Sequence, residues 1–294
     1  LYSSATAQSI SKNFENLVSN VLENSTQKIT NLSMCSAADV FKIAHTFNDS
    51  DQEFPSEKFL IELFEAQALL HPNETAAIFK NKSITYSELN ELSNKFANFL
   101  QKKGIQQQQL IPVYINRSLE MMVVLLGIMK TGAAYVAIPT EFGLLENRIK
   151  HILQDTEASF VVSDRKNAPA FQSTSAATCI IENSWDSILQ EDMKFAKPTI
   201  KATDLAYIVY TSGSGGKPKA VLTHHLGLVN FMQVIKSPLQ INQNTHFLGL
   251  ASYSFDGSCM ELYLPFLHGG KVTIAPEGVI RDVKELKKLI KTSQ

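Results

Sequence analysis

The chain has 294 residues, of which 44% are hydrophobic, so it is long enough for one large or two ordinary globular domains with real cores. Its formal net charge of −1 leaves no basic footprint, and no apolar run reaches membrane-spanning length, which argues against nucleic-acid and membrane partners. Cys35, Cys179 and Cys259 lie far apart without metal-ligand spacing, which indicates reduced thiols and a cytoplasmic setting.

Residues 1–54 have the pattern of a helix followed by a linker. Apolar residues recur there at helical spacing, which predicts an amphipathic helix that packs on a partner: Ile10, Phe14, Leu17, Val18, Val21 and Leu22. The first residues lack the basic and apolar regions of a signal peptide, so we expect none there. Residue 1 is Leu rather than Met, so we do not expect it to be a natural start. A polar linker then leads to Pro55, where we place a domain boundary.

From residue 55 onward, helices alternate with strands. We expect helices over residues 56–70, 87–103, 118–130 and 148–154, with Ser56 and Ser87 as N-caps, and strands over residues 75–80, 83–86, 110–115, 133–138, 159–163 and 180–181. Strands separated by helices imply an α/β fold with largely parallel sheets flanked by helices. In such folds, ligands bind beyond the carboxyl ends of the strands.

One segment is rich in groups that hold phosphate. The strand-like run 205–210 is followed directly by Thr211, Ser212, Gly213, Ser214, Gly215, Gly216, Lys217, Pro218 and Lys219. The glycines permit positive φ and close approach of a ligand, while the hydroxyls and lysines offer donors and positive charge. The segment is neither a P-loop nor a dinucleotide fingerprint, because its glycine spacing differs from both. It predicts a polyphosphate-binding loop; the alternative is a flexible surface turn.

This segment closely resembles the phosphate loop of adenylate-forming enzymes, and within them the adenylation domains of nonribosomal peptide synthetases. Further stretches are similar to motifs of that family in the same order: residues 84–89 (Ile-Thr-Tyr-Ser-Glu-Leu), 129–136 (Met-Lys-Thr-Gly-Ala-Ala-Tyr-Val) and 255–258 (Phe-Asp-Gly-Ser). The resemblance covers most of residues 55–276. It implies that residues 55–294 are the incomplete front portion of an adenylation (AMP-binding) domain. Residues 1–54 resemble the last helix of a condensation domain and its linker.

The resemblance also implies roles for individual residues. Thr211 to Lys217 and Lys219 would bind the phosphates of ATP, and Lys219 matches the motif lysine. Phe255, Asp256, Gly257 and Met260 would bind an amino acid substrate, with the carboxylate of Asp256 holding the ammonium group. An Asp at this position is also a common helix N-cap, and the two roles are compatible. His225 is a supporting residue, whereas the pair His224–His225 is not expected to act as a base.

The implied reaction is attack of an amino acid carboxylate on ATP, which yields aminoacyl-AMP and pyrophosphate. The acyl group then passes to phosphopantetheine on a carrier domain, beside a condensation domain of the same synthetase. The Mg²⁺-binding acid and the later adenine, ribose and lysine motifs are outside this chain, so we expect no complete catalytic set and an inactive isolated chain. Two alternatives stay open: a fragment of an acyl-CoA or aryl-acid ligase, or a non-catalytic remnant that acts as a binding module. Departures from the motifs, such as Gly215 and Ala220, favour the remnant.

Overall fold

The structure is a computed structural model that describes residues 2–140, 146–212 and 218–292. Contacts divide the chain into two compact units, Leu1–Phe54 and Pro55–Gln294, and each unit is described by itself. The division falls at the boundary expected from the linker. The assignment of the first unit to the end of a condensation domain stays a prediction.

The first unit is helical and has no buried side chains in its long helix. Helix α1 (Ser4–Glu23) is followed by η1 (Ile29–Asn31), α2 (Ala37–Phe41) and η2 (Lys42–Thr46). The side-chain amide of Asn20 donates to the carbonyl of Ser33 at 2.7 Å, which ties α1 to the segment after it. The expected amphipathic helix is therefore present, with an apolar face on which Phe14 remains 65% exposed.

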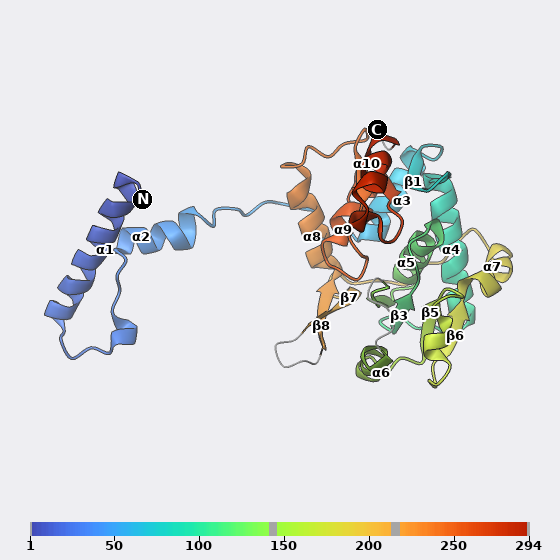
Figure 1. Cartoon of the computed structure of the whole chain (residues 1–294), viewed down its shortest axis with the longest axis horizontal. Coiled ribbons are helices and arrows are strands. Elements are labelled where there is room, and N and C mark those ends of the chain that lie inside the picture. The colour runs from blue at the N-terminus through green and yellow to red at the C-terminus, as the bar shows by residue number, and fades with distance from the viewer. Residues whose placement is uncertain (1, 141–145, 213–217, 293–294) are drawn as a thin grey trace. The chain divides into compact units, whose positions relative to one another are not determined.

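The second unit alternates helices and strands along the chain (Figure 1). Its α-helices are α3 (Leu60–Leu70), α4 (Tyr86–Lys102), α5 (Leu119–Lys130), α6 (Glu146–Asp155), α7 (Ile181–Leu189), α8 (His225–Lys236), α9 (Ser258–Leu262) and α10 (Val283–Thr292). Short 3-10 helices are η3 (Ala168–Phe171), η4 (Pro265–His268) and η5 (Val279–Arg281). Its strands are β1 (Thr75–Phe79), β2 (Lys82–Thr85), β3 (Leu110–Tyr114), β4 (Ala134–Ala137), β5 (Phe160–Ser163), β6 (Ala177–Ile180), β7 (Leu205–Ser212), β8 (Pro218–His224), β9 (His246–Gly249) and β10 (Lys271–Ile274).

The strands form two sheets. One has the order β2-β1-β10-β9 and the other β6-β5-β3-β4-β7-β8. All neighbouring strands run parallel except the hairpins β1–β2 and β7–β8, which lie at one edge of each sheet. The expected α/β class with largely parallel sheets is confirmed.

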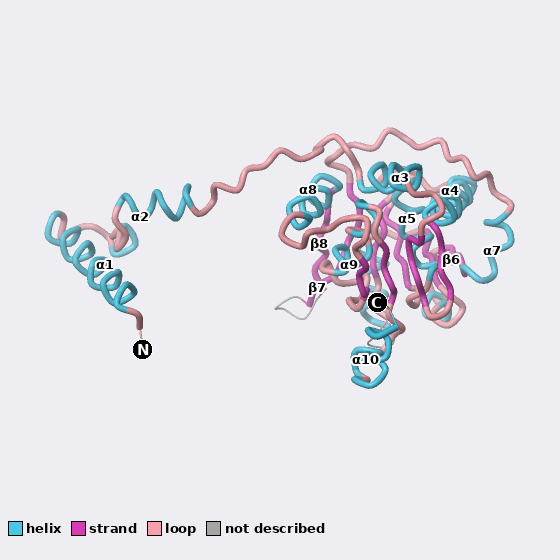
Figure 2. The backbone as a smooth tube through the Cα atoms, turned by 90° about the horizontal axis from the view of Figure 1, so that it is seen from above, coloured by secondary structure: helices cyan, strands magenta, loops and turns pink. Residues whose placement is uncertain are grey.

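Helix α5 is the centre of the core. Every residue from Met121 to Lys130 is buried, and the helix contacts strand β1 of one sheet and β4 of the other. A helix that is apolar on all sides has no face to offer to water, so it is stable only when it is enclosed. Figure 2 shows α3, α4 and α5 grouped together beside the strands.

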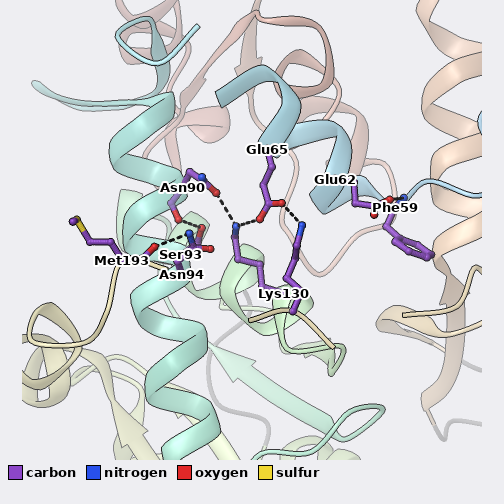
Figure 3. A network of polar contacts seen from close by, with 9 residues as sticks. Phe59, Glu62, Glu65, Asn90, Ser93, Asn94, Lys130 and Met193 are labelled. Atoms are coloured by element: carbon purple, nitrogen blue, oxygen red, sulfur yellow. Dashed lines mark hydrogen bonds and ion pairs between the residues drawn. The ribbon is translucent and has the colours of Figure 1, made fainter. Parts of the chain in front are cut away.

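One charged side chain lies inside this helical group. Lys130 is fully buried, and its ammonium donates to Oε1 of Glu65 at 2.5 Å and to Oδ1 of Asn90 at 2.7 Å (Figure 3). Lys197 forms a second ion pair with Glu65. Burial lowers the pKa of Lys130 to about 8, although the carboxylate of Glu65 opposes this shift. The network joins α3, α4 and α5 at one point.

Several element boundaries differ from the sequence expectation. The helix expected from Ser56 begins at Leu60, because Glu62 accepts a hydrogen bond from the backbone N–H of Phe59 at 3.1 Å and closes the first turn there. The next helix is capped by Thr85 rather than Ser87, since Thr85 and Glu88 form a reciprocal capping box. Strand β8 and helix α7 were not predicted.

Candidate functional site

The predicted phosphate segment lies where strand β7 ends. The run 205–210 forms β7, which continues through Thr211 to Ser212, and strand β8 begins at Pro218 and pairs antiparallel with β7. Gly213, Ser214, Gly215, Gly216 and Lys217 were also assigned to phosphate binding, and they lie outside the described residues. The segment therefore spans two strand ends of one hairpin.

Two residues of the segment that are described lie opposite each other. Thr211 pairs with Lys219 across the hairpin, and the hydroxyl of Thr211 donates to the carbonyl oxygen of Lys219 at 3.5 Å. Both side chains are exposed, and within the described part of the chain Lys219 forms no ion pair. An exposed cation without a carboxylate partner is available to an anionic ligand.

A cavity of about 660 Å³ lies beside the end of β7, at Tyr210. Its walls come from residues that follow the carboxyl ends of β3, β4, β9 and β10, so strands of both sheets converge on it. Its lining includes Arg117, Arg148, Tyr210, Phe255 and Glu277. The position is the one expected for a ligand site in a parallel α/β sheet, and the volume is in the usual range for small-molecule sites.

Three arginines, Arg117, Arg148 and Arg281, and one carboxylate, Glu277, are among the described lining residues, so the charged groups of the cavity are net positive. Arg117 donates through Nη1 to the carbonyl of Gly249 at 3.0 Å and through Nη2 to that of Leu250 at 2.5 Å. Arg148 donates through Nη2 to the carbonyl of Tyr210 at 3.0 Å and has no ion pair among the described residues. The cavity therefore suits an anionic ligand such as a nucleotide.

These arginines were not predicted as site residues from the sequence. Arg117 does carry a recognisable signal, because it follows the expected strand 110–115 by two residues, at the edge where ligands bind. Arg148 was expected only as the first residue of a helix, and nothing local marks its proximity to Tyr210.

Of the four residues predicted to bind the amino acid, only one lines the cavity. Phe255 lines the cavity, whereas Asp256, Gly257 and Met260 are not among its lining residues. Asp256 is exposed and precedes α9, whose N-cap is Gly257; Oδ1 of Asp256 accepts a hydrogen bond from the N–H of Gly257 at 2.7 Å. The alternative role of Asp256 as the N-cap is therefore not observed. Its role in substrate binding stays a prediction.

His225 lies at the opposite end of the β7–β8 hairpin from Thr211. Its neighbour His224 pairs with Leu205, six residues before Thr211, or about 20 Å along an extended strand. The ring of His225 is fully buried and packs edge-on against Phe59, with 5.5 Å between ring centroids. Burial lowers the pKa of His225 to about 4, so the ring is neutral at physiological pH. The structure does not bring it to the phosphate segment.

Among the residues that the structure describes, no group of three or more His, Cys, Asp or Glu side chains could hold a metal ion. Within the same residues, no helix is long and apolar enough to cross a bilayer. The described site is thus a cationic cavity next to a hairpin with a free lysine.

The family model of AMP-binding enzymes matches residues 64–294. The chain belongs to the AMP-binding enzyme family, as its motifs predicted. Its sequence is 33% identical over 294 residues to tyrocidine synthase 3 of Brevibacillus parabrevis; the match covers 100% of this chain and 4% of that protein. This chain therefore spans only a small part of that relative.

Solved structures agree with the family. The N-terminal subdomain of Klebsiella oxytoca NpsA, in complex with 3-hydroxyanthranilyl-AMSN, is similar with a TM-score of 0.72 and 28% identity over 82% of this chain and 60% of that one. An artificially fused adenylation–PCP di-domain of a nonribosomal peptide synthetase, NpsA-ThdA from Klebsiella oxytoca, has a TM-score of 0.73 and 28% identity over 80% of this chain and 46% of that one. The fold is that of adenylation subdomains.

Proposed function

We propose that residues 55–294 serve as the ATP-binding front portion of an adenylation domain in a nonribosomal peptide synthetase. An amino acid carboxylate attacks the α-phosphorus of ATP, a new C–O–P bond forms, and the bond to the β-phosphate breaks to release pyrophosphate. The observation that carries the proposal is the match to AMP-binding enzymes over residues 64–294, together with an arginine-lined cavity at Tyr210, directly before the predicted phosphate segment.

The described residues suit the electrostatic part of this reaction. Lys219 is exposed and has no carboxylate partner among the described residues, and Arg148 adds a second positive charge beside Tyr210. Cations placed where negative charge develops on the pyrophosphate leaving group lower the barrier of the reaction. Mg²⁺ would add charge of the same sign.

We infer the wider setting from one relative, from helix α1 and from the cysteines. A fused adenylation–PCP protein is similar to this chain, which supports a carrier domain with a phosphopantetheine arm as the next partner. A condensation domain of the same synthetase would lie on the N-terminal side, where helix α1 presents an apolar face. All three cysteines are unpaired, which fits a reducing compartment such as the cytoplasm.

A second candidate is activation of an aryl acid. The solved relative in complex with 3-hydroxyanthranilyl-AMSN favours it, as does the exposed position of Asp256 outside the cavity. An amino acid needs a carboxylate beside its ammonium group, whereas a benzoic acid does not. The two candidates share the nucleotide chemistry and differ only in the acid.

Substrate-dependent exchange of pyrophosphate into ATP by the full-length protein tests both candidates. Exchange with at least one α-amino acid, and its loss in Asp256→Ala, is the result expected for a peptide synthetase. Exchange with benzoic acids and not with amino acids would replace that function by the second candidate. A folded protein that supports no exchange with either panel contradicts both and leaves a non-catalytic binding module.

A further inference from the structure

Helix α6 has a polar face directed at the β7–β8 hairpin. Arg148, His151 and Asp155 are spaced three and four residues apart, so they lie on one side of the helix. Its buried residues are apolar and belong to the second core cluster: Ile149, Ile152 and Leu153. The helix is therefore anchored by packing while its polar side chains are free to contact the hairpin.

Each of the three side chains contacts a strand end. Arg148 donates to the carbonyl of Tyr210 at 3.0 Å, and the hydroxyl of Tyr210 donates to Oδ2 of Asp155 at 2.5 Å. Nε2 of His151 lies 3.2 Å from the carbonyl of Pro218. A carbonyl oxygen only accepts, so this contact requires the proton of His151 on Nε2. Burial and the carboxylate of Asp155 raise the pKa of Tyr210, which keeps its hydroxyl a donor.

Tyr210 and Pro218 bracket the phosphate segment in the sequence. Tyr210 directly precedes Thr211, and Pro218 directly precedes Lys219. Thr211 and Lys219 pair with each other across the hairpin. A single helix thus holds the strand on which the segment begins and the strand on which it ends. No other described helix makes hydrogen bonds to both residues.

We propose that Arg148, His151 and Asp155 are positioning residues that fix Thr211 and Lys219, the described residues on either side of the proposed phosphate segment, before ATP arrives. A preformed site loses less conformational freedom on binding, so the affinity for the nucleotide is higher. The effect on ATP rests on the proposed function, whereas the effect on the hairpin does not.

The first test needs no nucleotide. Hydrogen–deuterium exchange is measured on peptides that cover residues 205–224 in the full-length protein, for the wild type, Arg148→Gln, His151→Leu, Asp155→Asn and the control Gln154→Ala, which changes an exposed residue of the same helix. We expect amides of residues 210–211 and 219–220 to exchange about tenfold faster in the first three variants and to be unchanged in the control. Unchanged exchange in all three variants, at unchanged thermal stability, would overturn the inference.

The second test uses ATP–pyrophosphate exchange kinetics. The KM for ATP should rise about tenfold in His151→Leu, while the KM for the acid substrate stays within about twofold. His151→Gln should restore most of the ATP affinity, because its amide N–H can donate to Pro218; it also serves if the Leu variant does not fold. Parallel losses in both KM values, without rescue by Gln, would contradict a positioning role. An inactive wild type would contradict the proposed function, and hydrogen exchange alone would then decide the inference.

Discussion

Two groups of positive charges in the second unit have opposite surroundings. Lys130 is fully buried, and its ammonium group is paired with the carboxylate of Glu65 and the side-chain amide oxygen of Asn90, so the protein itself satisfies the charge. Lys219 is exposed and Arg148 lines a cavity, and among the described residues neither has a carboxylate partner. The first arrangement stabilises the fold, and the second leaves charge for a ligand.

This difference separates two lysines that a motif search treats alike. Lys130 and Lys219 both lie in stretches similar to motifs of the family, yet Lys130 is buried and Lys219 is exposed. A charge that is compensated inside the protein has little left to offer a substrate. Mutations in the two groups should therefore change different measurements.

The largest effect is expected from Lys130→Met. Removing the ammonium leaves Glu65 partly buried with only Lys197 as a charged partner, so the free energy of unfolding should fall by about 3 kcal/mol. Chemical denaturation measures this loss. The control Lys288→Met breaks an exposed pair with Glu285 and should change the free energy by less than about 1 kcal/mol. Equal losses in the two variants would contradict the structural role of Lys130.

The stability of the protein should depend on pH through His225, at the end of the β7–β8 hairpin away from Thr211. Burial lowers the pKa of His225 to about 4, below its ordinary 6.5, so between these pH values the unfolded state binds a proton that the folded state excludes. Stability should therefore decrease as the pH falls through this window, by at most about 3 kcal/mol from this residue. Urea unfolding between pH 7 and pH 4 measures it.

The variant His225→Leu should flatten this pH dependence in part, because burial also lowers the pKa of His268 to about 4. The exposed neighbour provides the control, since His224→Leu should keep the slope of the wild type. A slope in His225→Leu as steep as that of the wild type would show that His225 is not the buried neutral group described here.

Salt should distinguish the two charge groups with a smaller effect. Exposed cations that bind a polyphosphate are screened by ions, whereas a buried pair is not. Raising NaCl from 0.05 to 0.5 M should weaken ATP binding several-fold and leave the midpoint of thermal unfolding nearly unchanged. Titration calorimetry and a thermal scan on the same samples compare the two; a nucleotide affinity independent of salt would remove Lys219 and Arg148 from the site.

The sequence predicted the fold class and most element positions because caps and apolar runs are local signals. Ser118 was expected at the start of a helix and does cap α5. Strand β8 was missed because its residues 218–224 were read as part of the phosphate motif and the helix after it. The predicted start of α3 was wrong because Ser56 is a common N-cap residue, whereas the first turn is closed by the side chain of Glu62.

The candidate site was predictable only in part. The phosphate segment has its groups in one stretch, so sequence alone indicates its chemistry. The cavity is made by residues from several strand ends, and its positive charge comes from arginines that no motif joins, such as Arg117 and Arg148. Asp256 could be recognised by its motif, but its exposed position before α9 depends on the turn that precedes the helix.

Lys219 of the β7–β8 hairpin, which has no ion pair among the described residues, is proposed to bind the phosphates of ATP. Titration of Mg²⁺–ATP into the full-length protein tests it, with Lys219→Ala compared against Lys82→Ala, which removes an exposed lysine from the other sheet. We predict that Lys219→Ala weakens ATP binding about tenfold or more, the loss expected for a charge-assisted hydrogen bond, and that Lys82→Ala stays within about twofold of the wild type. ATP binding by Lys219→Ala with the affinity of the wild type would contradict the account.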